Sequence, residues 1–358
     1  MFSNDSARQA DACRFCWMCR HICPVAGSTG NEAWNPRARG LISMIERGTK
    51  YDAEIAEAMY HCTMCEACSN DCVTGYKPTD FIREARTLAV VNDIAPKAII
   101  REIDNVLTSG NIFGKETSAD LLAAIDSLPE KAETLLYVGQ SGRTVASGTA
   151  IAAISFLKKA GVDFTVLKDE PASGAYLADL MGLTGDVQAV AVKAADVIKA
   201  SGAKKLIVLN PMDAVMFRDN YSRWGLLGGI EVVTFTAAAA ELIESGAVKV
   251  QKAELRASLH EPVKLTRGID EEKPLNDIIA ALGIDHVQLF LHGKMSRCIG
   301  TVMMDGYDPA VSRVMVKTRL DDAHRLGCSV LLAASPDDCY LMKKYAADGF
   351  EIIDLIEL

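Results

Sequence analysis

The chain lacks the features that mark export, membrane insertion or nucleic-acid binding. No apolar run approaches the length of a membrane span, and residues 1–12 are polar with charges of both signs, which argues against a signal peptide. The net charge of −9 argues against nucleic acid as a partner. We therefore expect a cytoplasmic protein without a direct membrane span, whose contact with any membrane runs through a partner.

Motifs for substrate chemistry are also missing. Residues 139–144 follow a predicted strand and precede a predicted helix, but they lack the full dinucleotide fingerprint and the P-loop pair of lysine and hydroxyl. No catalytic triad, zinc-protease helix or carboxylate pair is recognisable. Asp213, Asp337 and Asp338 fit the first turns of helices, where a carboxylate opposes the positive end of the dipole. We therefore expect a chain without a catalytic site of its own.

Cysteine is arranged in a clear pattern. Eight of the 11 cysteines lie in two runs of identical spacing, C-x2-C-x2-C-x3-C. The runs are Cys13, Cys16, Cys19 and Cys23, and then Cys62, Cys65, Cys68 and Cys72. Three thiolates at this spacing hold three corners of a 4Fe-4S cluster, and the fourth cysteine reaches across to the other cluster. The sequence therefore predicts two 4Fe-4S clusters.

The same spacing rule predicts which cysteines share a cluster. One cluster takes Cys13, Cys16, Cys19 and Cys72, and the other takes Cys62, Cys65, Cys68 and Cys23. Two other uses of cysteine fit less well, because structural zinc sites usually show two separated CxxC pairs and a chain of 358 residues does not need disulfides to fold. Thiolate ligands must stay reduced until the metal is loaded, which agrees with a reducing compartment.

The segments around the cysteine runs are predicted to be helical. Asn35-Pro36 gives a cap residue followed by proline in the first turn, and apolar residues recur from 38 to 47. Further helices are expected over 53–60, from Thr79 or Asp80 to 88, and over 97–107. We therefore predict an α-helical ferredoxin domain at 1–95, which holds both clusters, and a helical connector at 96–132.

From residue 134 onward, short β-prone runs alternate with helices, which is typical of a parallel sheet covered by helices. The strands are expected at 135–138, 164–167, 206–209, 232–235, 287–290 and 329–333. The helices are expected at 146–159, 187–200, 237–244, 308–325 and 336–347. The second half repeats the first, since the turn 209–213 corresponds to 334–338 and the loop 171–174 to 297–300. The predicted fold class is therefore α+β and multidomain, with two tandem α/β repeats at 133–258 and 259–358.

With these pieces placed, the whole chain resembles the iron–sulfur subunits of the anaerobic glycerol-3-phosphate dehydrogenase, glycolate or lactate oxidase and heterodisulfide reductase D family. The resemblance rests on both cysteine runs and on the helix start Asn35-Pro36-Arg37-Ala38-Arg39-Gly40. The proline that usually follows the second run is replaced by Val73. This change does not affect cluster binding, because proline is not a ligand.

The carboxy-terminal half resembles that family in architecture but not in chemistry. In the family each α/β repeat carries a Gly-Cys, a Cys-Cys-Gly loop and a Cys-Pro-x-Cys turn, and in heterodisulfide reductases these cysteines bind a non-cubane cluster. The corresponding positions of the first repeat are Gly139-Gln140, Ala172-Ser173-Gly174 and Asn210-Pro211-Met212-Asp213. The second repeat keeps Cys298, and its turn is Ser335-Pro336-Asp337-Asp338. The resemblance thus implies degenerate CCG-type repeats that lack a third cluster.

Two features of the carboxy-terminal half leave alternatives open. Cys298, Cys328 and Cys339 could converge on a metal or form a redox pair, although free cysteines are commonly small buried hydrophobes. The loop 292–298 gathers three potential cations that could bind an anion, although an ordinary surface loop also fits this composition.

We expect the chain to be the electron-transfer subunit of a cytoplasmic oxidoreductase complex. Two 4Fe-4S clusters would relay single electrons between a flavoprotein dehydrogenase and a downstream acceptor, which is another iron–sulfur subunit or a quinone-linked one. One alternative is a heterodisulfide-reductase-like thiol/disulfide reductase that uses Cys298 and Cys339. Another is an assembly scaffold with structural clusters. Ligand spacing encodes neither the substrate of the complex nor the direction of electron flow.

Overall fold

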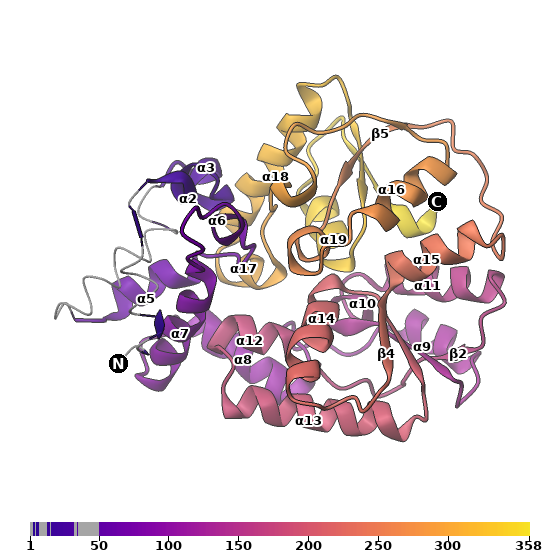
Figure 1. The fold of residues 1–358 in the computed structure, drawn as a ribbon, viewed down its shortest axis with the longest axis horizontal. Helices are drawn as coiled ribbons and strands as arrows, with labels where there is room; N and C mark the ends of the chain where they lie inside the picture. Colours follow the sequence, from indigo (N-terminus) through magenta and orange to yellow (C-terminus); the bar gives the residue numbers. More distant parts are fainter. Residues whose placement is uncertain (1–2, 4, 7–12, 15, 32–33, 35–49) are drawn as a thin grey trace.

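The computed structural model describes residues 3, 5–6, 13–14, 16–31, 34 and 50–358. The predicted helix at 38–47, with its start at Asn35-Pro36, lies outside the described residues. Figure 1 shows a helical part, which contains both cysteine runs, at one side of the molecule and a larger part with two sheets at the other. The protein is thus a mixture of helices and parallel sheets, as predicted.

The described helices of the amino-terminal part are α2 (Met18–His21), α3 (Pro24–Thr29), α5 (Ala53–Tyr60), α6 (Ala67–Asn70), α7 (Pro78–Val91), α8 (Lys97–Ser109) and α9 (Ala119–Asp126). The Asp52 side chain caps α5 by accepting from the Ile55 amide, and proline begins α3 and α7. The predicted helices at 53–60, 79–88 and 97–107 are confirmed, and α7 and α8 extend beyond the predicted ends.

The first sheet has four parallel strands in the order β2-β1-β3-β4. The strands are β1 (Thr134–Tyr137), β2 (Phe164–Thr165), β3 (Lys205–Val208) and β4 (Glu231–Thr234). The helices are α10 (Gly139–Arg143), α11 (Ser147–Lys159), α12 (Ala175–Met181), α13 (Gly185–Ala200), α14 (Pro211–Val215), the π-helix η1 (Met216–Tyr221) and α15 (Phe235–Glu244). The strand order reverses between β1 and β3, and the carboxyl ends of strands at such a point are where open α/β sheets bind ligands.

The second sheet is also parallel and has the order β6-β5-β7-β8. The strands are β5 (Arg256–His260), β6 (Asp285–His286), β7 (Val330–Ala333) and β8 (Glu351–Asp354). The helices are the π-helix η2 (Lys264–Gly268), α16 (Lys273–Ala281), the 3-10 helices η3 (Gly293–Met295) and η4 (Leu355–Glu357), α17 (Val302–Tyr307), α18 (Pro309–His324) and α19 (Pro336–Tyr345). The second sheet therefore repeats the strand order of the first.

The strand expected at 287–290 is wrong. The strand in that region is β6, which ends before this segment, and Phe290 lies in the following loop with 88% of its surface exposed. Strands β5 and β8 were not predicted from the sequence. Strand β5 contains Ser258 and His260, which are buried, and the Ser258 hydroxyl is satisfied by donating to the Val287 carbonyl (2.8 Å). Because these polar residues break the apolar run, β5 has no clear strand pattern, and the expected boundary at residue 259 falls within it.

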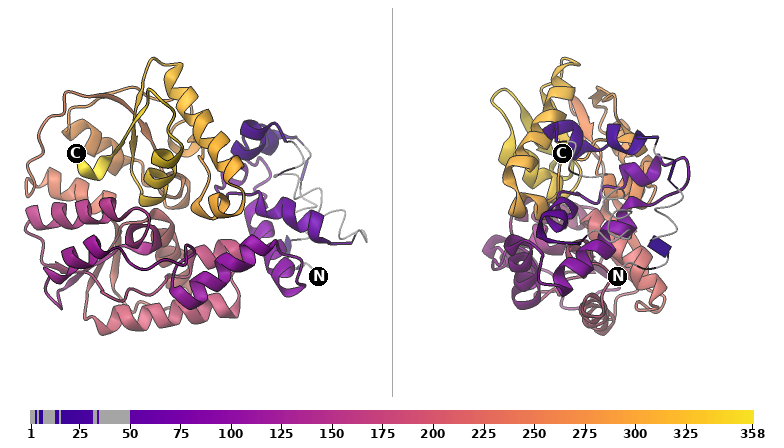
Figure 2. Two further views of the ribbon diagram at one scale, coloured as in Figure 1. Left: turned by 180° about the vertical axis from the view of Figure 1, so that it is seen from behind. Right: turned by 90° about the vertical axis from the view of Figure 1, so that its left-hand side faces the viewer.

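The helical part packs against both sheet units. Helices α7 and α8 contact α12 of the first unit, while α3 contacts α18 and α8 contacts α17 of the second. The end-on view in Figure 2 shows the helical part in front of both units. One apolar core includes Ile99 and Ile103 of α8, Leu177 of α12 and Val302 of α17. The cysteine runs are therefore held at a junction of three parts of the chain.

Candidate functional site

The two cysteine runs bend the chain in the same way. Trp17 follows Cys16 with a φ of 66°, and Glu66 follows Cys65 with a φ of 62°. A positive φ is uncommon for a residue other than glycine. In each run this residue directly precedes a four-residue helix, α2 or α6, which carries the third cysteine of the run. The equal spacing of the two runs thus corresponds to an equal backbone path.

The structure brings together four thiols that were predicted to hold one cluster. Cys23, Cys62, Cys65 and Cys68 are all buried. Burial raises the pKa of Cys68 well above its ordinary value, and the neighbouring Cys62, Cys65 and Cys23 raise it further. Burial likewise raises the pKa of Cys23, and the neighbouring Cys65 and Cys62 raise it further. Four thiolates in such a place need compensating positive charge, which the iron of a cluster supplies. The residues present therefore fit a 4Fe-4S cluster.

Three of the other four cysteines lie nearer the surface. Cys13 is buried, Cys16 is exposed, and Cys19 and Cys72 are half-buried. Cys19 is close enough to Cys68 to raise its pKa, so the two predicted ligand sets adjoin. Within the part of the chain that the structure describes, no three Cys, His, Asp or Glu side chains converge on a position for a single metal ion. The pairing of ligands with clusters stays a prediction.

The Arg86 side chain of α7 holds the start of the second cysteine run by hydrogen bonds to main-chain carbonyls. Its Nη2 donates to the carbonyl oxygens of Met59 (2.8 Å) and Cys62 (2.6 Å), and its Nη1 donates to the Asp179 carbonyl in α12. Burial raises the pKa of Cys62 to about 11, and the charge of Arg86 opposes that rise. The guanidinium therefore places positive charge beside a predicted ligand while it fixes the backbone.

Two cations from η2, in the second sheet unit, hold the next part of the run. Lys264 Nζ donates to the Met64 carbonyl (3.1 Å), and Arg267 Nε donates to the Cys65 carbonyl (2.6 Å). We refer to Arg86, Lys264 and Arg267 together as the carbonyl clamp. Because the clamp uses main-chain carbonyls, it fixes the loop without occupying the thiols. The sequence does not reveal the contributions of Lys264 and Arg267, since each of these cations lies about 200 residues from its partner.

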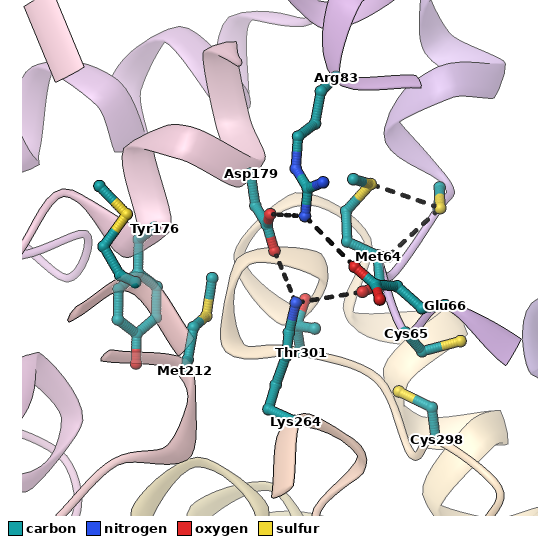
Figure 3. A network of polar contacts seen from close by, with 12 residues as sticks. Met64, Cys65, Glu66, Arg83, Tyr176, Asp179, Met212, Lys264, Cys298 and Thr301 are labelled. Atoms are coloured by element: carbon teal, nitrogen blue, oxygen red, sulfur yellow. Dashed lines mark hydrogen bonds and ion pairs between the residues drawn. The ribbon is translucent and has the colours of Figure 1, made fainter. Parts of the chain in front are cut away.

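Asp179 balances part of this charge. It accepts from Arg83 Nη2 (3.4 Å) and Lys264 Nζ (3.3 Å), and Figure 3 shows it between the two cations. Burial would raise the pKa of Asp179, but Lys264 and Arg83 outweigh burial and lower it. The ion pairs border a cleft of about 540 Å³ between the helical part and the first sheet unit, which Glu66 and Met212 also line.

The positions that resemble lost cluster ligands form a buried hydrogen-bond network instead. The Tyr176 hydroxyl donates to both carboxylate oxygens of Asp337 (2.9 and 3.0 Å), and the Asn210 amide donates to Asp337 Oδ1 (2.9 Å). Ser173 donates to Asp213 Oδ1. Burial raises the pKa of Asp213 to about 8 and that of Asp337 to about 6. The network lies at the carboxyl ends of β1, β3 and β7 and links the two sheet units.

The three remaining cysteines have different surroundings. The Cys298 thiol donates to the Gly300 carbonyl (3.3 Å), and Cys298 packs in the same apolar cluster as Cys65, whose pKa it lowers. Cys339 lies near Asp354 and Lys343, and burial raises its pKa. The Cys328 thiol donates to the Val330 carbonyl (3.3 Å). The structure thus does not give Cys298 and Cys339 the shared neighbours that a redox pair would have.

The basic side chains of the loop 292–298 have partners elsewhere in the chain. Lys294 forms an ion pair with Asp270 (2.8 Å), and Arg297 forms one with Asp322 (3.1 Å). His292 Nδ1 lies 3.0 Å from the Leu289 carbonyl. These contacts favour the ordinary surface loop over the anion-binding alternative, because Lys294 and Arg297 already have carboxylate partners.

Comparison with known proteins agrees with this geometry. Residues 9–76, which include both cysteine runs, match the family of 4Fe-4S dicluster domains. The amino-terminal part is an iron–sulfur domain of ferredoxin type. A protein from Chromohalobacter salexigens, named a probable membrane-anchored ferredoxin, is 26% identical over 279 residues, which are 75% of this chain and 41% of that protein. The chain thus spans less than half of the relative, and both findings support iron–sulfur electron transfer.

A likeness to a solved structure is weaker. Glutamate racemase isoform RacE1 from Bacillus anthracis matches with a TM-score of 0.32 and 17% identity, over 63% of this chain and 77% of that chain. A score this low supports no statement about fold or function. Among the described residues, no helix has both the length and the apolar composition to cross a bilayer.

Proposed function

We propose that the chain relays single electrons through two 4Fe-4S clusters as a subunit of an oxidoreductase complex. A bound 4Fe-4S cluster takes up or releases one electron at a time, so two clusters can divide the electron pair that a flavin delivers. The observation that carries the proposal is the set of four buried thiols, of which Cys23 comes from the first run and the other three from the second. This arrangement supports the predicted exchange of the fourth ligand between runs.

The chain's own residues would hold and tune the clusters. Burial of the thiols limits water near the sulfurs, and the carbonyl clamp adds positive charge next to one ligand set. Both factors influence the reduction potential of an iron–sulfur cluster. Cys16 is exposed and Cys19 and Cys72 are half-buried, so the ligand set to which they are assigned would suit the side that exchanges electrons with a partner.

We also propose that the two sheet units are degenerate CCG-type repeats, that the chain belongs to the family it resembles, and that it works in the cytoplasm. The equal strand order of the two sheets supports the repeat. The hydrogen-bonded Asp213 and Asp337 at the lost ligand positions support the absence of a third cluster. The units would then form a docking platform for a flavoprotein dehydrogenase, with an iron–sulfur or quinone-linked subunit as the acceptor.

The first experiment measures iron and acid-labile sulfide per chain on anaerobically purified protein, followed by electron paramagnetic resonance (EPR) during stepwise reduction. We expect about eight irons and two interacting 4Fe-4S signals. About four irons, or substantially more than eight, would contradict two clusters. Clusters that cannot be reduced at biological potentials would point to the scaffold instead.

A second experiment tests the docking platform. The chain is purified with its native partners, and the interface is mapped by cross-linking and mass spectrometry. Cross-links from a flavin-containing partner to residues in both sheet units are expected. Cross-links restricted to residues 1–95 would refute the platform while leaving the electron relay intact.

A further inference from the structure

A cleft of about 520 Å³ lies between the two sheet units. Its walls come from α11 and α15 of the first unit and from α16 and η4 of the second. Figure 1 shows α11, α15 and α16 at the opposite side of the molecule from the helical part that contains the cysteine runs. Small-molecule sites in proteins usually enclose about 300–1,000 Å³. The cleft is therefore large enough for a ligand, and it is separate from the predicted clusters.

The walls of this cleft are largely apolar. Phe235, Ala239 and Ile243 recur at every fourth residue of α15, so they lie along one face of that helix. The Phe235 ring packs edge-on against the Phe156 ring of α11, with the ring centroids 5.7 Å apart. Apolar side chains of both units line the cleft, among them Phe156, Phe235, Ile243, Ile278, Leu355 and Ile356. An apolar group that covers these walls would remove their surface from water, which favours its binding.

Two lysines line the same cleft. Lys159 is an exposed residue at the end of α11, and Lys249 is an exposed residue of the segment that follows α15. Neither ammonium forms an ion pair with any residue that the structure describes. Glu357, an acidic residue that also lines the cleft, already pairs with Lys343 (3.7 Å). The positive charge of Lys159 and Lys249 is therefore available to a ligand.

We propose that this cleft binds a fatty-acid-like amphiphile, which has one alkyl chain and an anionic head. The alkyl chain would lie against the apolar walls, and the head would lie next to Lys159 and Lys249. Removal of the chain from water favours binding, and the two lysines favour an anionic head over a cationic one. A peptide would bring main-chain N–H and C=O groups against apolar walls, where each would need a partner, whereas an alkyl chain carries no such groups.

The test is isothermal titration calorimetry of the full chain, purified anaerobically, with dodecanoate below its micellar concentration. We expect one dodecanoate to bind per chain, with the negative change in heat capacity that marks apolar burial. Dodecyltrimethylammonium has a chain of the same length and a cationic head, and it should bind at least about tenfold more weakly. Vesicles of anionic phospholipid distinguish a free fatty acid from a membrane lipid. Protein that sediments with these vesicles but binds no dodecanoate would overturn the proposal.

Variants locate the site. The double variant Lys159→Glu with Lys249→Glu reverses the charge beside the proposed head and should weaken dodecanoate binding by about tenfold. Lys158→Glu is the matched control, because Lys158 does not line the cleft and donates to the Ser127 hydroxyl (2.7 Å), and it should bind as the parent does.

Ala152→Phe adds a ring to the α11 wall from a half-buried position and should weaken binding at least about tenfold by occupying the cleft. Far-UV circular dichroism checks that each variant is folded, and the lysine variants, which change exposed residues, decide the matter if Ala152→Phe does not fold. Equal affinities for the anionic and cationic amphiphiles, or parental affinity in the double lysine variant, would overturn the proposal. So would a parent chain that binds no dodecanoate and instead covers this cleft by forming a dimer.

Discussion

Replacing Lys264 by methionine tests whether the second sheet unit holds the loop of the second cysteine run. The Lys264 ammonium lies 3.3 Å from Asp179 Oδ2 and 3.1 Å from the Met64 carbonyl oxygen. Methionine keeps the apolar stem of lysine but removes its charge. Asp179 then keeps only Arg83, at 3.4 Å, of its two ion-pair partners, and the Met64 carbonyl loses the Lys264 donor. Breaking a buried ion pair costs about 3–5 kcal/mol, and a buried carbonyl without a donor costs about 1–3 kcal/mol. Because Arg83 remains, we expect the free energy of unfolding to fall by about 3 kcal/mol.

Anaerobic urea unfolding at constant pH, followed by far-UV circular dichroism, measures this loss. Asp179→Asn and the double variant complete a double-mutant cycle, and the double variant should lose clearly less than the sum of the two single variants. Lys317→Met is the control, because its partner Asp321 is an exposed residue of the same helix, and it should lose less than about 1 kcal/mol. A Lys264→Met variant as stable as this control, or an additive cycle, would refute the reasoning.

Three further predictions concern the sheet units. Burial raises the pKa of Asp213 from 3.8 to about 8, so between these pH values the folded state keeps a proton that the unfolded state releases. The free energy of unfolding should therefore fall as pH rises through this window. Urea titrations at several pH values should show a smaller decline in Asp213→Asn than in the parent. Gly139→Ala should lower the melting temperature more than Gly202→Ala does. Both glycines have a φ of +79°, but only at Gly139 would a new Cβ overlap Asp213 Oδ2, so equal shifts would contradict the clash. Arg319→Met removes a fully buried donor to the Leu291 carbonyl (2.9 Å). The free energy of unfolding in urea should fall by about 1–3 kcal/mol. A variant as stable as the parent would show that the carbonyl finds another donor.

Local signals were enough to predict much of the helical part and the first sheet. Apolar recurrence predicted α5, and the expected start at Thr79 or Asp80 lies within two residues of Pro78, where α7 begins. Strands β1 and β3 are apolar over most of their length because helices cover both faces, and their composition alone shows this. The cysteine spacing was equally informative, since a ligand run needs only a few consecutive residues to define it.

The features that single-sequence reasoning missed depend on distant partners. Buried Ser258 and His260 conceal β5, since their polarity is tolerated only through contacts made elsewhere in the fold. The contact between Cys298 and Cys65 joins segments far apart in the chain, and neither segment signals the other. Asn210 and Asp337 were singled out in the sequence as parts of two corresponding turns, but the link between them across the two units follows only from the tertiary arrangement.

The carbonyl clamp also bears on how the protein is made. Lys264 and Met64 are separated by 200 residues, so a ribosome completes the second cysteine run long before it adds the side chain that holds it. During synthesis the run can receive only Arg86 of the three cations, since η2 belongs to the last third of the chain. The final conformation of the loop around Cys62 and Cys65 therefore awaits folding of the second sheet unit.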